Sequence, residues 1–557
     1  MHVSFKGPFT RFAKWIHLIV QQKFHEVPIS ASTSGLHGKE KKTHIDCTVD
    51  SSMAIDPYLV AATALCLVVH LLLYRFFRKS PSRLPYPPGP RGLPILGALL
   101  LVGASAHSSL ARLAKRYGPV MFLRLGSHGC VVASNADAAR AFLKTVDAQF
   151  ANRPAPISAR DVSYQRQNLV MADNTPTWKL LRKMCSLHLL GGKAFADWAP
   201  VRREEFRRMA RSLHGLAEAG EPVEVMDVLV CTLANVVGLI LVSRRVFDAH
   251  GEESNKFKDI LADMLTGGSQ FNIGDFFPSI AWMDLQGIQK KMLSVHLRFD
   301  AMVTKLFEEH EATKGERQGR LDFIDKVMAN KVTEDGATIS EINVKALIFD
   351  LFTAGTDTSA IIVEWAMAEM LKNPAILGRA QAELDDVVGR DRLVEETDLP
   401  KLAYLQAVCK EAMRLHPSTP LALPHYSHED CEVNGYYIPK NTRLLVNIWA
   451  IGRDPEVWEE PLVFDPVRFI TGKGARYDPQ GNDFEFIPFG AGRRVCAGKL
   501  VGMVFVQYLL GMLVHAFDWS LPDGEELNMD EKFGLALPKA VPLKAFPRPR
   551  LSPAAYA

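Results

Sequence analysis

Most of the chain carries apolar residues at intervals of three and four, the spacing that places them on one face of an α-helix. This pattern is clearest at Phe195–Leu216, Lys291–His310 and Val344–Leu371. Runs typical of strands, such as VMFLRLG and VVAS, are short and few. Segments 311–320 and 471–482 are rich in residues typical of loops. We therefore predict a mainly α-helical body with a minor β-sheet.

One apolar run near the amino terminus differs from the rest. Residues Tyr58–Tyr74 read YLVAATALCLVVHLLLY, and at about 1.5 Å per residue such a helix covers most of a hydrocarbon core. Four basic residues follow it: Arg75, Arg78, Lys79 and Arg83. Because basic residues favour the cytosolic side, we predict a single-pass signal anchor at residues 53–80 with a luminal amino terminus. The alternative is a cleaved signal peptide.

The segments on either side of this anchor differ in composition. Residues 81–97 include PYPPGPRGLPILG, whose prolines fix φ and exclude helix, so we predict a stiff linker. Residues 1–52 are polar, and Met53 stands just before the anchor. We interpret them as a poorly structured extension, either a gene-model artefact with Met53 as the natural start or a transit segment. Residues 98–557 remain for the main folded domain.

Length and charge narrow the class of protein. The chain has 557 residues, of which 48% are hydrophobic, so it can bury an enzyme-sized core. Its 65 basic and 62 acidic residues are interspersed, which argues against nucleic acid as a partner. The 8 cysteines form no CxxC pair, which argues for a reducing compartment and against a disulfide scaffold or zinc ribbon.

One of these cysteines lies in an unusual loop, FIPFGAGRRVCAGKL at Phe486–Leu500. The residues that fit the form F-x-x-G-x-R-x-C-x-G are Phe489, Gly492, Arg494, Cys496 and Gly498. Glycines let the backbone approach a flat cofactor and free amides to hydrogen-bond a sulfur, so Cys496 is a candidate metal ligand. The simpler alternative, a buried free cysteine, leaves its neighbours unexplained.

This loop resembles that of the haem-thiolate monooxygenases called cytochrome P-450, and the resemblance covers nearly the whole chain after Met53. It implies the cytochrome P-450 fold, haem b as cofactor and Cys496 as the axial ligand of its iron. A thiolate ligand donates electron density to iron and favours cleavage of the O–O bond. Arg494 would then pair with a haem propionate.

A second motif agrees with this assignment. In KEAMR, Glu411 and Arg414 stand three residues apart and so share one helical face. Alone, such a pair is a common surface ion pair. Arg468, in PLVFDPVRF, resembles the third member of the family's structural triad. The resemblance therefore implies a Glu411, Arg414 and Arg468 triad.

The segment AGTDTS, Ala354–Ser359, supplies the predicted catalytic pair. Thr356 and Thr358 can hydrogen-bond back to helix carbonyls, and Gly355 loosens a helix, so we expect a local widening there. Oxygen chemistry needs protons, which a hydroxyl beside a carboxylate can deliver through water. By resemblance, these groups are Asp357 and Thr358.

Further haem contacts follow from the same resemblance. In WKLLR, Trp178 and Arg182 stand four residues apart on one face and would contact a propionate. The segment NTPT precedes Trp178 where relatives often carry glycine. His425, in LALPHYS, fits a later propionate contact.

The source of electrons must be another protein. We find no Gly-rich dinucleotide fingerprint after a strand and no flavin module in the sequence. The resemblance therefore implies NADPH as the electron source, a membrane-bound reductase as the partner, and a catalytic domain in the cytosol at the endoplasmic reticulum membrane. Candidate docking bases are Arg182, Lys183, Arg493 and Lys499.

Three distant segments narrow the substrate: FNIGDFFPSIAWMDLQGIQKKM, GNDFEFIPFGAGRR and FGLALPKAVPLKAFPRPRLSP. Together they resemble the plant flavonoid B-ring hydroxylases. Gly534–Leu537 reads GLAL, as in the group that acts at both the 3' and 5' positions, and the small Ala536 would leave room for a ring that already carries one hydroxyl. Pro538 departs from the group's pattern. We select Ala354 and Ala536 as pocket residues over Phe271 and Phe277, since aromatic residues there are more often core.

The predicted function is therefore NADPH- and O2-dependent hydroxylation of flavanones and dihydroflavonols at 3' and 5'. Alternatives are a flavonoid 3'-hydroxylase or another plant phenylpropanoid or terpenoid monooxygenase. A haem-thiolate isomerase or dehydratase would be expected to lack the Asp357 and Thr358 pair. A non-catalytic haem-binding protein would need neither that pair nor a pocket loop.

Overall fold

The chain divides into two units, Met1–Lys79 and Ser80–Ala557. The computed structural model describes residues 62–70 and 84–557, without 248–259, 261–262, 264–269, 314, 316–321, 331, 333–335 and 337. In the first unit, residues 62–70 form a helix. The rest of the predicted anchor and residues 1–52 lie outside the described residues, so the anchor and the segment boundaries stay predictions.

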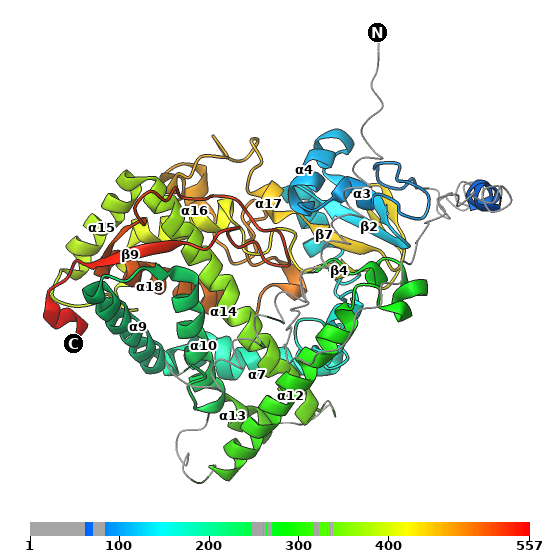
Figure 1. The fold of residues 1–557 in the computed structure, drawn as a ribbon. Helices are drawn as coiled ribbons and strands as arrows, with labels where there is room; N and C mark the ends of the chain where they lie inside the picture. Colours follow the sequence, from blue (N-terminus) through cyan, green and yellow to red (C-terminus); the bar gives the residue numbers. More distant parts are fainter. Residues whose placement is uncertain are drawn as a thin grey trace, which may run out of the picture. The chain divides into compact units, whose positions relative to one another are not determined.

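Long helices form the larger part of the second unit (Figure 1). The longest is α14 (Glu341–Lys372), and it begins with a capping box in which Ser340 and Asn343 bond each other's backbone N–H groups. The other long helices are α4 (Ala106–Tyr117), α7 (Pro176–Cys185), α9 (Ala199–Ala219), α10 (Val225–Val242), α12 (Ile288–Ala312), α15 (Pro374–Val388), α16 (Ala403–Leu415) and α18 (Lys499–Ala516).

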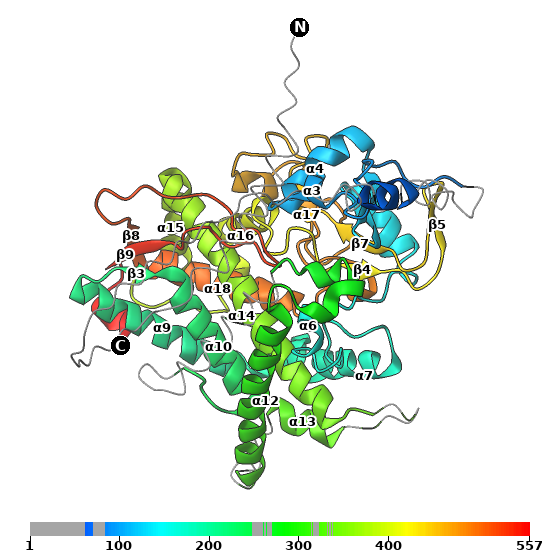
Figure 2. The same cartoon turned by 45° about the vertical axis from the view of Figure 1, so that its right-hand side comes forward.

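The main sheet lies beside these helices (Figure 2). It has four strands in the order β1-β2-β7-β4, namely β1 (Val120–Leu125), β2 (His128–Ala133), β7 (Arg443–Val446) and β4 (His425–Tyr426). Strands β2 and β7 are parallel, with Cys130 opposite Arg443, and the other two pairings are antiparallel. The predicted mainly helical body with a minor sheet is confirmed.

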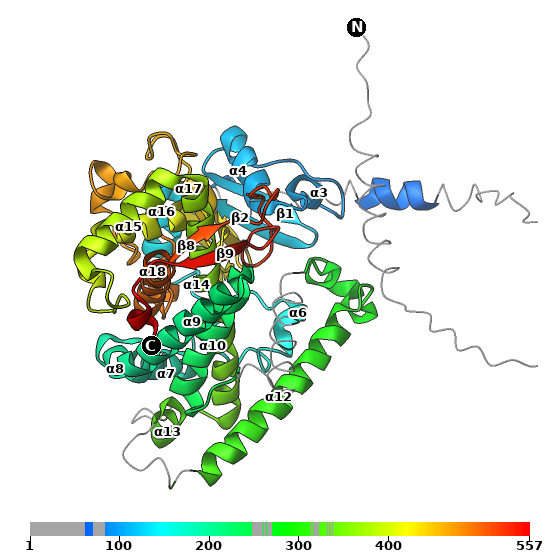
Figure 3. The same cartoon turned by 60° about the vertical axis from the view of Figure 1, so that its left-hand side comes forward.

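Smaller elements complete the unit. Strands β3 (Val223–Glu224), β9 (Lys544–Pro549) and β8 (Phe517–Ser520) form one sheet, and β5 (Cys431–Val433) pairs with β6 (Tyr436–Ile438). Figure 3 shows α6 (Ile157–Arg160) beside α12. The other short α-helices in the described part of the chain are α3 (Leu99–Val102), α5 (Ala136–Arg140), α8 (Gly192–Asp197), α13 (Phe323–Ala329) and α17 (Ile448–Ile451). Two π-helical turns, η1 (Ala141–Thr145) and η2 (Ser186–Leu190), continue α5 and α7.

Among the described residues, three helices are long and apolar enough to cross a membrane by length and composition: Val225–Val242, Glu341–Lys372 and Lys499–Ala516. Their apolar windows are 61%, 61% and 67% buried within the protein. Because α14 packs against both α10 and α18, we interpret all three as core helices. They bring the segments of the candidate site together.

Candidate active site

A cavity of about 290 Å³ lies between α14, α7, the start of α18 and the loop that precedes α18. Its wall is mostly apolar and includes Leu169, Val170, Leu351, Phe489 and Val501. Among the predicted site residues, those on the wall are Trp178, Arg182, Ala354, Thr358, His425, Phe489, Arg494, Cys496 and Gly498. The fold therefore gathers residues from across the chain around one space.

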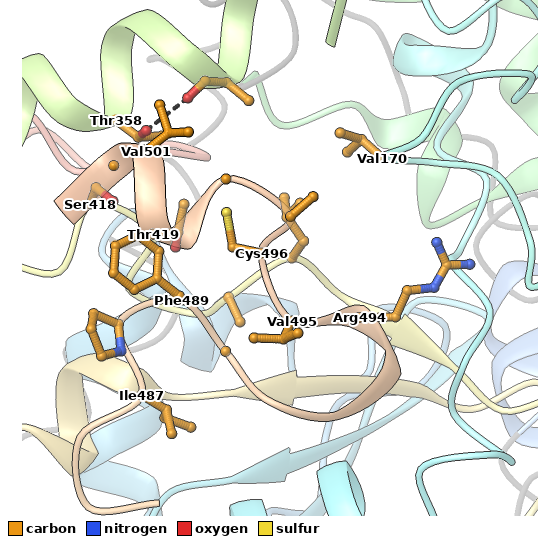
Figure 4. Close-up of a pocket in the computed structure, with 18 of the residues that line it drawn as sticks. Val170, Thr358, Ser418, Thr419, Ile487, Phe489, Arg494, Val495, Cys496 and Val501 are labelled. Atoms are coloured by element: carbon orange, nitrogen blue, oxygen red, sulfur yellow. Dashed lines mark hydrogen bonds between the residues drawn. The ribbon is translucent and has the colours of Figure 1, made fainter. Parts of the chain in front are cut away.

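Cys496 presents its thiol to this cavity, between Thr358 and Val170 in the view of Figure 4. Its backbone N–H donates to the Phe489 carbonyl over 2.9 Å, which closes the loop. Burial among protein atoms raises the pKa of the thiol, although the side chain keeps accessible surface toward the cavity. The Gly498 N–H, Arg182 and Lys499 act in the opposite direction. These groups, Gly498 and Lys499 at the start of α18 and Arg182 on α7, would stabilise a thiolate.

The predicted loop glycines have different tasks. Gly492 has φ +70°, and a Cβ there would lie 2.2 Å from the Leu143 carbonyl oxygen. Glycine is therefore needed at this turn, although Gly492 does not line the cavity. Gly498 lines it, and a Cβ at this position would lie 4.0 Å from the Cys496 sulfur. A flat cofactor could thus approach the sulfur closely.

Positive charge collects at one end of the cavity. Arg494 donates to the Ala151 and Ala172 carbonyls, and burial lowers its pKa to about 10. Arg182 donates to the Val495 carbonyl over 2.6 Å. His425 is buried, with Nδ1 3.0 Å from the Phe150 carbonyl, and burial, with Arg153 next, holds its pKa well below the usual range.

Arg153 joins this group, and sequence reasoning missed it. Its guanidinium donates to the Leu423 and Pro424 carbonyls, while its buried Nε has no hydrogen-bond partner among the residues that the structure describes. Burial, then repulsion from Arg494 and Arg182, lowers its pKa to about 9. The surrounding sequence ANRP has no periodic or motif pattern that marks Arg153 as a site residue. Only the tertiary fold brings it to the cavity. An anion there would relieve the repulsion and could meet the free Nε.

Trp178 lies in the same group but uses its polar atom elsewhere. Its indole N–H donates to the Leu169 carbonyl over 2.9 Å, and the Arg494 guanidinium carbon lies 4.1 Å from its ring centroid. The indole therefore supports Arg494 through a cation–π contact. The guanidinium groups, with the predicted Arg182 and Arg494 among them, remain the donors for an anionic ligand.

The α14 segment places the predicted catalytic pair at the cavity. Thr358 lies on the wall and donates to the Ala354 carbonyl over 2.8 Å, and Thr356 donates to the Phe352 carbonyl over 2.7 Å. The expected widening at Gly355 is wrong, because α14 is α-helical throughout. The threonine hydroxyls bond carbonyls without displacing the backbone ladder. Asp357 lies behind the wall, and burial, partly opposed by Thr356, raises its pKa to about 6.

The triad residues meet in the core. Arg414 donates two hydrogen bonds of 2.7 Å to the Glu411 carboxylate, and both side chains are fully buried. Arg468 Nε donates to the same carboxylate over 3.0 Å. Arg414 also donates to the Gly452 and Pro461 carbonyls. The structure thus brings the three predicted members together and ties α16 to the segment at 452–468.

The remaining predicted residues lie away from the cavity wall. Ala536 is half-buried and Phe271 is exposed, and neither they nor Phe277 line the cavity. Of the candidate docking bases, Arg182 is half-buried and lines the cavity. Arg493 pairs with Asp147 at 2.7 Å, and Lys499 donates to the Gln480 carbonyl. Lys183 is exposed.

Comparison with known proteins gives the family of this fold and site. The family model for cytochrome P-450 matches residues 87–543. The chain is a cytochrome P-450. A solved structure of zebra fish cytochrome P-450 with abiraterone is 26% identical, with a TM-score of 0.68, and the match covers 80% of this chain and 100% of that one. This cytochrome P-450 is therefore a haem-thiolate monooxygenase.

Curated relatives of this cytochrome P-450 carry more specific names. A flavonoid 3',5'-hydroxylase of Solanum melongena is 52% identical over 89% of this chain and 97% of the relative. Flavonoid 3',5'-hydroxylase 2 of Petunia hybrida is 54% identical over 90% and 98% of the two chains. A flavonoid 3'-monooxygenase of Petunia hybrida is 46% identical over 88% and 97%.

The cavity of this cytochrome P-450 fits haem. The loop offers one sulfur ligand beside glycines that allow close approach. The cluster of Arg153, Arg182 and Arg494 offers donors for two carboxylates. The Arg153 Nε, which has no partner in the described part of the chain, is the kind of buried donor that an anion would satisfy.

Proposed function

We propose that this cytochrome P-450 hydroxylates the B-ring of flavonoids, flavanones and dihydroflavonols among them, at the 3' and 5' positions. The observation that carries the proposal is identity of 52% and 54% to proteins named for this activity, over about nine tenths of the chain. The 3'-monooxygenase relatives, at 46% and 47%, are less similar. Single hydroxylation at 3' is therefore the second candidate.

Within this proposal, Cys496 would hold the haem iron through its sulfur, and Arg153, Arg182, Arg494 and His425 would hold the haem carboxylates. Bound haem supplies oxygen activation, with one oxygen atom entering a C–H bond and the other leaving as water after two electrons and two protons are added. The mostly apolar wall offers bulk water few polar partners, so protons would arrive through the few polar side chains beside the cavity.

Asp357 and Thr358 are the proposed proton-delivery groups. The Thr358 hydroxyl lies on the cavity wall, and its hydrogen bond to Ala354 fixes its position. Asp357, with a pKa raised to about 6, is mostly ionised at neutral pH yet can take up and release a proton. Thr358 would hold a water in the cavity, and Asp357 would resupply its proton.

The proposed substrate end combines apolar and hydroxyl groups. Ala354 presents a small side chain to the cavity, and Ser418 and Thr419 lie on its wall (Figure 4). A flat phenolic ring suits apolar surfaces with a few polar atoms. Ala536 would act through the turn that it shares with Leu537, whose N–H bonds the Ser418 carbonyl.

The proposed setting is the endoplasmic reticulum membrane. Residues 53–80 would anchor the chain, and the catalytic unit would take electrons from NADPH through a reductase in the same membrane. Lys183, an exposed base on α7, is the docking candidate that we retain.

Microsomes that contain the chain and a plant reductase, supplied with NADPH and a 4'-hydroxylated flavanone, test the proposal. We expect a product heavier by two oxygens and no product without NADPH or reductase. A product heavier by one oxygen would support 3'-hydroxylation, and turnover without NADPH would indicate an isomerase. No product, despite the red-shifted Soret band of the ferrous carbon monoxide complex, would refute the flavonoid substrate.

A further inference from the structure

A short turn near the carboxyl end is hydrogen-bonded, through the backbone of Leu537, to Ser418 of the cavity wall. Residues Glu531 and Lys539 form an antiparallel bridge, and Lys532 N–H donates to the Pro538 carbonyl over 3.0 Å, so Gly534–Leu537 is the end of a hairpin. Leu537 is fully buried, and its N–H donates to the Ser418 carbonyl over 2.9 Å. Because Ser418 lines the cavity, the hairpin is joined directly to the cavity wall.

The other polar backbone group of Leu537 has a distant partner. Trp365, on α14 and fully buried, donates its indole N–H to the Leu537 carbonyl over 2.9 Å. Leu537 thus lies between Ser418 on one side and Trp365 on the other. If the Leu537 carbonyl lost this donor, it would be buried without a hydrogen bond. That cost would favour displacement of the turn.

Trp365 is itself held in place. The His416 ring stacks parallel to the indole, with ring centroids 4.0 Å apart and planes 2° from parallel. His416 Nε2 lies 2.8 Å from a Glu369 carboxylate oxygen, and the Lys539 ammonium lies 4.8 Å from the indole centroid. His416 stands two residues before Ser418. Trp365 therefore contacts both segments that meet here: it bonds Leu537 in the turn and stacks on His416, near Ser418.

We propose that Trp365 is a positioning residue: by its hydrogen bond to Leu537 it holds the 534–537 turn against Ser418 and so sets the width of the substrate cavity. Trp365 does not line the cavity and would act through Leu537. The proposal rests on the proposed function for its substrate readout. Small changes in the room that a pocket allows shift preference between similar substrates by about tenfold or more.

The test uses the full chain with Trp365→Phe, which removes the N–H. Trp519→Phe is the matched control, because Trp519 also donates a 2.9 Å indole hydrogen bond to a leucine carbonyl, that of Leu513, away from the cavity. We expect amide hydrogen exchange of peptides that contain 534–537 to quicken about tenfold in the first variant only. Exchange equal to that of wild type would overturn the proposal.

Cavity width is measured without any flavonoid. Spectral titration gives the ratio of the affinities for 4-phenylimidazole and imidazole, and we expect Trp365→Phe to change this ratio about tenfold while Trp519→Phe leaves it unchanged. With a flavanone as substrate, Trp365→Phe should change the ratio of doubly to singly hydroxylated product. It should also change KM more than kcat. An unchanged affinity ratio would overturn the proposal, even if the turn exchanges faster.

The two proposals fail in different ways. If wild type produces nothing from flavonoids, the proposed function fails, while exchange and the affinity ratio still test Trp365. If Trp365→Phe does not bind haem, benzothienylalanine at position 365 replaces the N–H with sulfur and keeps the ring's shape. That variant should reproduce the faster exchange and altered ratio, and wild-type values would overturn the role of the N–H.

Discussion

Cys496 and Asp350 both line the cavity, and burial raises the pKa of each. Cys496 has the Gly498 N–H and two bases to offset burial. Asp350 accepts from Asn168 Nδ2 over 2.7 Å and from Val170 N–H over 2.9 Å, so it fastens the cavity wall at 168–170 to α14. At the scale of single residues, the surroundings of Cys496 thus suit it to bind a metal, and those of Asp350 suit it to stabilise the cavity wall.

Replacing the proposed ligand tests the first role. Cys496→Ser should abolish the red-shifted Soret band of the ferrous carbon monoxide complex and lower activity by at least about a thousandfold, because a hydroxyl does not replace thiolate donation. Cys431→Ser, in β5 and away from the cavity, is the control and should keep both. An unchanged band in Cys496→Ser would show that another residue binds the iron.

The pH dependence of stability tests the second role. Burial raises the pKa of Asp350 from 3.8 to about 7, so between these pH values the folded chain holds a proton that the unfolded chain releases. The contribution of Asp350 to the free energy of unfolding therefore falls by up to about 4 kcal/mol as pH rises from 3.8 to about 7. Above that pH it stays constant. In Asp350→Asn, the urea midpoint should fall less than that of wild type between pH 5 and pH 7.5. Equal falls would contradict this account.

At the scale of elements, the buried carboxylate of Glu411 joins α16 to the segment around Arg468. Removing Glu411 would leave the Arg414 guanidinium buried without a counter-charge, which costs about 3 to 5 kcal/mol. Glu411→Ala should therefore give little protein that binds haem, measured by the carbon monoxide difference spectrum. The matched control is Glu204→Ala, which breaks exposed pairs with Arg208 and Arg211 and should cost less than about 1 kcal/mol. Similar yields from both variants would contradict the structural role of the triad.

The elements also separate what the sequence predicts from what it does not. Local patterns were sufficient for α12, α14, the loop of Cys496 and the Glu411 pair, because spacing and composition encode them. Arg153 and Trp365 were missed because their partners, Leu423 and Leu537, are distant backbone carbonyls. The widening at Gly355 failed as a prediction because helix packing can outweigh a local preference for distortion.

At the scale of the whole molecule, the division between Lys79 and Ser80 leaves the cavity and the triad in the second unit. This unit contains its own hydrophobic core, so it has what it needs to fold. A chain that begins at Ser80 should bind haem and give the same carbon monoxide difference spectrum as the full chain. Failure to bind haem in detergent solution, where the full chain succeeds, would contradict this prediction.

The most direct test of the central claim is the mass of the product formed under oxygen-18 gas by the full chain with reductase, NADPH and a 4'-hydroxylated flavanone. We predict a flavonoid that carries two labelled oxygen atoms, both on the B-ring. An unlabelled product, or none from a preparation with an intact carbon monoxide spectrum, would contradict the account.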